Sequence, residues 1–374
     1  MATDPSPCVK GHSAFIFDRG GTNQMFKLTD LSEVRWNRVR DDISESNVKI
    51  AARNCYAQAD NLNLVEAGRH ELVIFRGKER KWEGPITRTT LATDGIEFHA
   101  KDVVHYLSRT NLTAEFNNKH PYSDYALERV KDLLTELARL EAEEQAAFPD
   151  LPSRNLLPHV TYHQDPTDAR TSRYTAAYQK TIWEEIDDMA AKGGIDYTAV
   201  GRAIHFWDTS KPLGELSREI TQNDILGQLV ATQYGMDLKT RAVVTDGEGN
   251  YGQAGGVDPY YGLVENLETA YDESEGTDPP TSAEMESQAE RNLVGGSPSP
   301  LMLRIPDNSG IRLSKTLTID DLVPGMFVTV RARLLIRDIV QKMKLDQMSV
   351  IETGAGEQVT VKFSPASQPD EVPA

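Results

Sequence analysis

The chain has 374 residues, 39% of them hydrophobic and 26% charged, and its 57 acidic and 40 basic side chains give a formal net charge of -17. This length predicts two or three domains, each large enough to bury its own core. The acidic balance repels a nucleic-acid backbone and argues against a DNA-reading protein. No apolar run approaches the ~20 residues that cross a bilayer, so we expect no membrane anchor.

The N-terminus predicts synthesis in a cytoplasm, and the cysteine content argues against disulfides. The first residues, MATDPSPCVKGHSAFIFDRGG, lack the basic-then-apolar order of a signal peptide. The cysteines, Cys8 and Cys55, are too few for a disulfide framework, and we do not expect them to pair.

Residues 1–112 are predicted to form a small antiparallel barrel or sandwich built from three hairpins. The hairpins are FIFDRGGTNQMFKL, ELVIFRGKERKWEG with a two-residue loop at Gly77 and Lys78, and TRTTLATDGIEFHA with a type I′ turn at Asp94 and Gly95. Pro85 lacks a backbone N–H, so it is expected at a bulge or an edge where a strand bends. The segment KDVVHYLSRT closes the unit as a short helix.

Residues 113–210 predict an α+β middle domain with two long helices. The first spans 122–147, where apolar residues recur at helical spacing and Ser123 or Asp124 is the expected N-cap. The second spans 171–194 and ends at Gly193 and Gly194. Strands are expected afterwards, in IDYTAVGRAIHFWD.

Residues 211–295 predict a further α+β segment. TQNDILGQLVATQYG is predicted to be a helix, and residues 245–279, rich in Gly, Asp and Glu, to be surface loops. Another helix is expected from Thr281, because Thr281 and Glu284 fit a capping box and two glycines at 295–296 end the run.

Residues 296–366 predict a second barrel-like unit, and residues 367–374 a disordered tail. Val328 and Val330 alternate with polar residues, as do Val359, Val361 and Phe363 after a turn at 354–356. The predicted fold class is therefore α+β and β-rich, with two small antiparallel β-barrel-like domains flanking α+β domains.

The strongest metal candidate is HVTYHQD, with His159, His163 and Asp165. Histidines four apart share one face of a helix, but this stretch follows Pro158, is rich in β-branched residues and lacks the glutamate of HExxH. We expect a loop whose histidines face water or accept backbone hydrogen bonds, and metal binding stays a minor alternative.

No other pattern carries chemistry. TDGEGN lacks the spaced ligands of a calcium loop, YGQAGG does not open a helix, and Cys55 is predicted to pack. The paired carboxylates, Glu184 with Glu185 and Asp187 with Asp188, are expected on a solvated helix face. The sequence also contains four scattered tryptophans, whose spacing does not indicate a platform on which bases could stack: Trp36, Trp82, Trp183 and Trp207. We therefore predict a structural protein, with no catalytic, cofactor-binding or metal-binding residue and no cofactor.

Several of these segments resemble a known family. They are Phe75 to Gly77, Lys81 to Ile86, ATDGIEFHAKDVVHYL, LTIDDLVPGMFVTVRA and IETGAGEQVTVKFSP. Together they resemble the tail hub, or tail-associated, minor tail proteins of long-tailed bacteriophages that infect actinobacteria. The resemblance covers about 30–110 and 210–366, and its motifs are structural corners instead of catalytic signatures.

The resemblance implies a fold similar to phage baseplate hubs and a place in the virion, at the distal tail tip. Three copies would form a ring, and each would supply two barrels, so that six similar units meet a hexameric tail ring. The hub would close the tail tube and open for DNA ejection. Implied partners are the distal tail protein ring, the tape-measure protein and tail fibre or receptor-binding proteins, with DNA only passing through the lumen.

Two functions from other classes stay open. One is a cell-wall hydrolase of the tail tip that uses carboxylates or the His159 and His163 pair. The other is a carbohydrate-binding module for host attachment. Many hub proteins continue into a peptidase, lysozyme or receptor-binding extension, whereas this sequence stops soon after its last predicted strand, so we do not expect it to digest the host wall.

Overall fold

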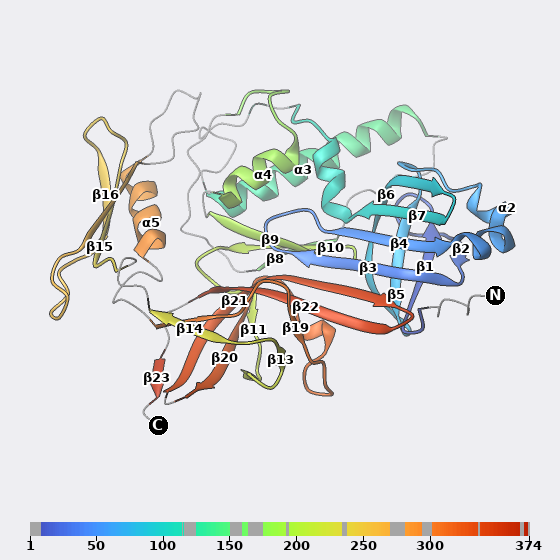
Figure 1. Ribbon diagram of the computed structural model, residues 1–374. Helices are drawn as coiled ribbons and strands as arrows, with labels where there is room; N and C mark the ends of the chain where they lie inside the picture. The colour runs from blue at the N-terminus through green and yellow to red at the C-terminus, as the bar shows by residue number, and fades with distance from the viewer. Residues whose placement is uncertain are drawn as a thin grey trace.

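Figure 1 shows the computed structural model of the chain. It describes residues 9–113, 115, 125–149, 159–163, 175–191, 194–233, 238–269, 281–293, 301–335, 337–366 and 370–372. Within these ranges, no helix has both the length and the apolar character needed to cross a membrane.

The N-terminal strands form one half of a large sheet. They are β1 (His12–Phe17), β2 (Gln24–Leu28), β3 (Leu31–Val39), β4 (Glu45–Ala51), β5 (Glu71–Arg76), β6 (Glu79–Ala92) and β7 (Gly95–Lys101). The first two predicted hairpins are confirmed, since β1 pairs with β2 and β5 with β6. Gly77 has a φ of +61° in its two-residue loop, as that turn requires. Short helices α1 (Ala52–Cys55), η1 (Tyr56–Gln58) and α2 (Ala59–Leu62) follow β4.

The third hairpin turns one residue earlier than predicted. Ala92 pairs with Gly95, so Thr93 and Asp94 form the loop, and neither has the positive φ of a type I′ turn. Gly95 is instead the first residue of β7. A Cβ atom there would lie 2.2 Å from the carbonyl oxygen of Ile50, so the close approach of β4 requires this glycine.

Strand β6 changes its partner at Gly84 and Pro85. Pro85 pairs with Glu71 of β5, and Ile86 pairs with Ala100 of β7, with a register shift immediately after it. A Cβ atom on Gly84 would lie 1.9 Å from the carbonyl oxygen of Lys101. The predicted bend is therefore the point where one strand passes between two partners. The predicted short helix is the 3-10 helix η2 (Val103–Arg109), in which Asp102 caps the N–H of Val104.

The C-terminal strands continue the same sheet. They are β11 (Gly214–Glu215), β12 (Ile220–Thr221), β13 (Ile225–Leu226), β19 (Ser309–Ile311), β20 (Met326–Leu334), β21 (Arg337–Thr353), β22 (Gly356–Pro365) and β23 (Asp370–Val372). The 3-10 helix η4 (Ile319–Asp321) precedes β20. Strand β23 lies in the tail that was predicted to be disordered, and it pairs with β21.

The helix predicted over residues 221–235 is wrong. Its positions are occupied by β12, β13 and β14 (Val230–Gln233), and β14 pairs with β18 (Leu301–Arg304). The carboxylate of Asp224 accepts both the N–H and the hydroxyl of Thr221 at 2.9 Å. This local turn competes with a helix, as aspartate side chains often do.

Strands from the two ends of the chain meet in the middle of the large sheet. β3 pairs antiparallel with β21, with Trp36 opposite Val350. In the resulting fifteen-stranded sheet, eleven strands follow one another in the order β13-β19-β22-β21-β3-β4-β7-β6-β5-β1-β2. The other four lie off this path: β20 and β23 pair with β21, and β11 and β12 pair with β20. Its ends, β13 and β2, do not pair, so the described strands form no closed barrel, whereas the β-rich composition is as predicted. One apolar core, running from Ala14 to Phe363, serves both units.

The middle of the chain forms a helix-covered sheet. Its elements are α3 (Ala126–Ala147), β8 (His159–His163), α4 (Ile182–Ala191), β9 (Ile195–Val200) and β10 (Ala203–Asp208). The helix α3 buries Leu127, Val130, Leu134 and Leu137 as predicted, while Ser123 and Asp124 lie outside the described residues. In Figure 1, α3 and α4 lie on one side of β8, β9 and β10, and the β3–β21 part of the large sheet lies on the other.

Helix α4 is much shorter than predicted. Thr181 and Glu184 form a capping box, in which each side chain accepts the other residue's backbone N–H, at 3.2 and 2.7 Å. Just before it, Tyr178 has a φ of +63°, which a helix does not accommodate. The N–H of Gly194 donates to Met189 at 3.0 Å and ends the helix, and Gly193 lies outside the described residues.

The segment predicted as surface loops contains a small sheet. β15 (Arg241–Thr245), β16 (Tyr251–Gly255) and β17 (Glu265–Thr269) carry helix α5 (Ser282–Leu293), which packs on Ala242 and Val244. A Cβ atom on Gly252 would lie 2.2 Å from the backbone nitrogen of Glu286, so only glycine at this position lets α5 pack on β16. The same glycine interrupts the alternation of side chains that would have predicted a strand. The side chain of Glu284 and the glycines at 295–296 lie outside the described residues.

Candidate functional site

The two predicted histidines of the metal candidate lie on a strand, not a loop. β8 runs parallel to β10, and residues four apart in a strand are separated by about 13 Å, too far to share one ion. His159 is exposed, and Asp165 lies outside the described residues. His163 instead contacts His205 of β10, with Nε2 and Nδ1 2.9 Å apart.

This histidine pair is held neutral by its surroundings. Burial lowers the pKa of His163, and burial together with the neighbouring His163 lowers the pKa of His205 to about 4. One neutral ring can then donate to the other. The pair therefore joins two parallel strands and does not present two free nitrogens to an ion.

Four of the eight carboxylates and tryptophans singled out in the sequence are buried, one carboxylate and three tryptophans, while Glu184 is exposed as expected. Glu185 is 1% exposed and accepts the hydroxyl of Thr175 at 2.8 Å, so the expectation of a solvated face is wrong for it. Asp187 accepts the Tyr197 hydroxyl at 3.2 Å. Three of the tryptophans are core residues, namely Trp36, Trp82 and Trp207.

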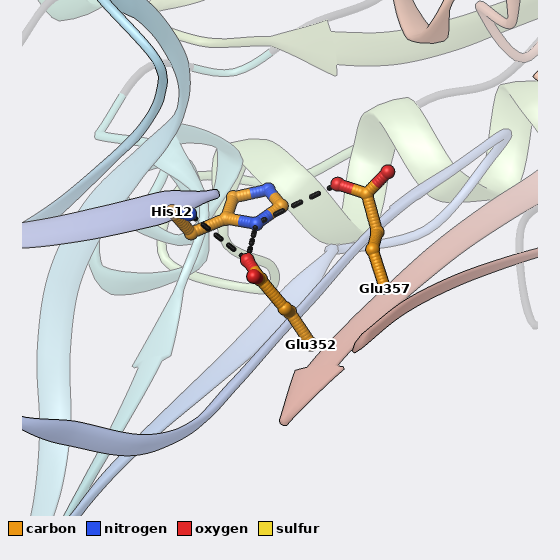
Figure 2. A group of neighbouring side chains, drawn as sticks. All are labelled: His12, Glu352 and Glu357. Atoms are coloured by element: carbon orange, nitrogen blue, oxygen red, sulfur yellow. Dashed lines mark hydrogen bonds and ion pairs between the residues drawn. The ribbon is translucent and has the colours of Figure 1, made fainter. Parts of the chain in front are cut away.

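A cluster that joins the two ends of the chain was not foreseen. Figure 2 shows His12 of β1 with Glu352 of β21 and Glu357 of β22. Nδ1 of His12 lies 2.6 Å from Oε2 of Glu352 and 3.7 Å from Oε2 of Glu357. Their ligand-type atoms all lie within 4.8 Å of one another, which is the spacing of a metal site.

The hydrogen bonds around this cluster do not leave room for a metal. The indole N–H of Trp36 donates to Nε2 of His12 at 3.2 Å, so Nδ1 carries the proton and donates to Glu352. Glu352 also accepts the backbone N–H groups of Lys10, Gly11 and His12, at 3.0, 2.7 and 2.9 Å.

Nε and Nη2 of Arg76 each donate a hydrogen bond to the Glu357 carboxylate, at 2.8 and 2.9 Å. Burial opposes ionisation of Glu352, but the donors from Gly11 and His12 prevail and hold its pKa below the usual value. The cluster is therefore a saturated ionic latch between β1 and the C-terminal strands.

A second ionic junction ties the middle domain to the large sheet. The Arg40 guanidinium contacts Asp41, Asp196 of β9 and Asp346 of β21, at 2.8, 3.1 and 2.9 Å. Lys344 of β21 also pairs with Asp196. Burial and the neighbouring Asp196 raise the pKa of Asp41 to about 7, although Arg40 lies beside it. Three segments distant in sequence thus share one guanidinium.

A third cluster lies under the turn between β9 and β10. Arg202 of this turn contacts Glu71 of β5 at 2.8 Å and Glu83 of β6 at 4.0 Å, and the hydroxyl of Tyr106 donates to Glu71. A Cβ atom on Gly21 would lie 2.9 Å from an oxygen of each glutamate, so the β1–β2 turn closes over them.

These glutamates are close enough to suggest an acid pair, but their surroundings argue otherwise. Glu71 and Glu83 are 0% and 1% exposed, so a polysaccharide cannot reach them. Burial raises the pKa of Glu83 even though Arg80 and Arg202 lie beside it. The three clusters thus act as fixed ionic junctions between β1, the middle domain and the C-terminal strands.

Comparisons with known proteins find likeness in structure alone. No protein-family model matches the sequence, and no curated protein matches it. The 43 kDa tail protein of prophage MuSo2 from Shewanella oneidensis aligns with a TM-score of 0.60 and 10% identity, over 95% of this chain and 98% of that one.

Two further solved structures align over similar lengths. The tail protein from Neisseria meningitidis MC58 gives a TM-score of 0.55 and 10% identity, over 95% of this chain and 96% of that chain. Prophage tail protein gp18 from Listeria monocytogenes EGD-e gives a TM-score of 0.54 and 12% identity, over 93% and 94%. The chain therefore has the fold of these tail proteins.

Proposed function

We propose that this chain, which shares its fold with solved tail proteins over nearly its whole length, is a structural component of a bacteriophage tail. The observation that carries the proposal is the alignment that covers 95% of this chain and 98% of the MuSo2 tail protein. A match over both whole chains includes the middle domain and the small α5 sheet, and is not a shared β-sheet alone. Fold likeness by itself is an analogy, so the proposal needs a direct test.

Within the tail, we place the chain at the distal tip as a homotrimeric hub of a siphophage that infects actinobacteria. The pairing of β3 with β21 supports this arrangement, because it joins the N-terminal and C-terminal units edge to edge in one sheet. Each copy would then contribute two units of a ring, and three copies would present six units to a hexameric tail tube. The three ionic junctions would keep the units at a fixed angle.

The hub would close the tail tube before infection and open it for DNA ejection. Its partners would be the distal tail protein ring, the tape-measure protein and tail fibre or receptor-binding proteins. The formal charge of -17 supports a lumen through which DNA passes without binding, because like charges repel.

A purified-protein experiment tests the assembly. Native mass spectrometry and negative-stain electron microscopy of the chain should give a trimer with the outline of a ring. A monomer that digests cell wall, and loses this activity on His163→Ala, would replace the hub with the hydrolase alternative. Binding of the isolated monomer to host glycan would favour the host-attachment alternative.

A further inference from the structure

The tip of the β20–β21 hairpin combines a strained backbone with an exposed apolar side chain. Leu334 pairs with Arg337, and Leu335 lies in the turn between them. Leu335 has a φ of +51°, and its side chain is 98% exposed. Such loops favour Asn-Gly, because those residues tolerate positive φ and leucine does not. A strained leucine that buries almost none of its side chain is better explained by a contact with another molecule than by packing within this chain.

The charge of this tip is opposite to that of the chain. Residues 331–337 read RARLLIR, with three arginines and no acidic residue, whereas the whole chain carries a formal charge of -17. Arg333 and Arg337 are both exposed beside Leu335. In Figure 1, the end of this hairpin lies at the lower edge of the molecule, away from α3 and α4. We call residues 331–337 the basic hairpin tip.

The small sheet carries the complementary surface. Residues 256–264, which join β16 to β17 and which we call the tyrosine loop, expose four large apolar side chains: Val257, Tyr260, Tyr261 and Leu263. Tyr260 is 87% exposed. Monomeric proteins rarely gather so many apolar side chains on one exposed loop unless it is a binding surface.

Hydrogen bonds hold the tyrosine loop in one conformation. The carboxylate of Asp258 accepts the backbone N–H groups of Tyr260 and Tyr261, both at 2.8 Å. Asp258 and Gly262 exchange two backbone hydrogen bonds of 2.9 Å. The two tyrosine rings meet edge to face, with centroids 4.8 Å apart. A partner therefore meets preorganised aromatic rings, and little conformational entropy is lost on binding.

The surroundings of this loop select a basic partner. The described residues of the small sheet and its helix, 238–269 and 281–293, contain eight acidic residues and three basic ones, so this unit is acidic even though Arg241 pairs with Glu265. Aromatic rings also attract guanidinium groups through their faces. The favoured partner therefore presents an apolar side chain flanked by arginines.

We propose that the basic hairpin tip of one copy binds the tyrosine loop of a second copy, with Leu335 against Tyr260 and Tyr261. Both surfaces are exposed in a single copy, so they do not meet within one chain. Each copy offers one tip and one loop, and such a head-to-tail contact closes into a ring when the rotation between copies is right. The inference rests on the proposed homotrimer and names its contact.

Cross-linking tests the contact directly. A photoreactive benzoylphenylalanine is placed at position 335 in the full chain, and isotope-labelled and unlabelled proteins are mixed before irradiation. Mass spectrometry should find peptides that join position 335 of one copy to residues 256–264 of the other. Cross-links that map to another surface would overturn the proposal.

Variants give an independent readout in sedimentation equilibrium. Leu335→Gly and Tyr260→Ser should each weaken self-association by at least about tenfold, as expected for apolar and tyrosine residues central to an interface. The matched controls, Leu91→Ser and Tyr56→Ser, remove exposed side chains elsewhere and should change it less than about twofold.

The outcomes separate this contact from the proposed function. A wild-type trimer whose Leu335→Gly and Tyr260→Ser variants still assemble fully would overturn the contact and leave the trimer intact. A wild-type chain that stays monomeric at all concentrations would contradict the trimer itself. If Tyr260→Ser instead abolished binding to host glycan with assembly unchanged, the loop would be a glycan site and the proposal would be wrong.

Discussion

The Nδ1–H group of His12 donates a hydrogen bond of 2.6 Å to Oε2 of Glu352, which lies 340 residues later in the sequence. The same carboxylate caps three successive backbone N–H groups at the start of β1, those of Lys10, Gly11 and His12. The first strand is thereby tied to β21 by side-chain bonds that the sheet order alone does not supply, because β1 pairs with β2 and β5. The latch therefore requires residues from both the N-terminal and the C-terminal strands.

Glu352→Ala should lower the free energy of unfolding by about 3 kcal/mol, because it leaves buried donors without an acceptor. Urea unfolding followed by circular dichroism measures this. Glu357→Ala is the matched control: its pair with Arg76 is partly exposed and should be worth less than about 1 kcal/mol. A loss below about 1 kcal/mol for Glu352→Ala would mean that the buried hydrogen bonds of this carboxylate do not stabilise the fold.

Arg40→Leu should destabilise the protein by about 3 kcal/mol, because three acidic groups then lose their shared cation and one of them, Asp196, is buried. Thermal unfolding is the measurement. Arg69→Leu serves as a control, since its contact with Glu66 lies at the surface and should contribute under about 1 kcal/mol. An Arg40→Leu protein as stable as the control would refute the junction.

Gly95→Ala should cost about 3 kcal/mol, because its new Cβ atom would overlap the carbonyl oxygen of Ile50. Gly214→Ala adds the same methyl group where the nearest atom, in Met326, lies 3.6 Å away, and should cost less than about 1 kcal/mol. Gly95→Val should disturb folding and tail assembly together. Normal stability of Gly95→Ala would show that β4 and β7 can separate freely.

The pH dependence of stability should report on His205. Its pKa is lowered from 6.5 to about 4 in the folded protein, so the unfolded chain binds a proton more readily. The stabilisation is therefore complete above pH 6.5 and is lost as the pH falls towards 4. His205→Gln should lose less of its stability between pH 7 and 5 than the wild type does.

Melting temperatures across that pH range provide the test. If His205→Gln followed the wild-type curve, the buried histidine pair would not be linked to folding.

Local features of the sequence predicted the local parts of the fold. The loop at Gly77 and Lys78 and the burial of Leu127, Val130 and Leu134 in α3 depend on neighbouring residues alone, and both are confirmed. The shortened α4 was also readable, because Thr181 and Glu184 have the spacing of a capping box. The tail-protein fold came from resemblance, and structural likeness supports it.

Features that depend on distant contacts were not predictable. In the sequence, Gly95 and Gly252 each look like turn or loop residues. The structure shows that Gly95 is needed because Ile50 approaches it closely, and Gly252 because Glu286 does. No spacing rule connects His12 with Glu352, or Arg40 with Asp196 and Asp346. Nor does alternation within β3 reveal that its free edge pairs with β21 and joins both units in one open sheet.

Immunogold electron microscopy of virions tests the central claim most directly. Antibodies raised against the purified chain should place gold at the distal end of the tail, and only there. Gold along the tube, gold at the head-proximal end, or virions that contain none of this chain would each contradict a hub at the tail tip.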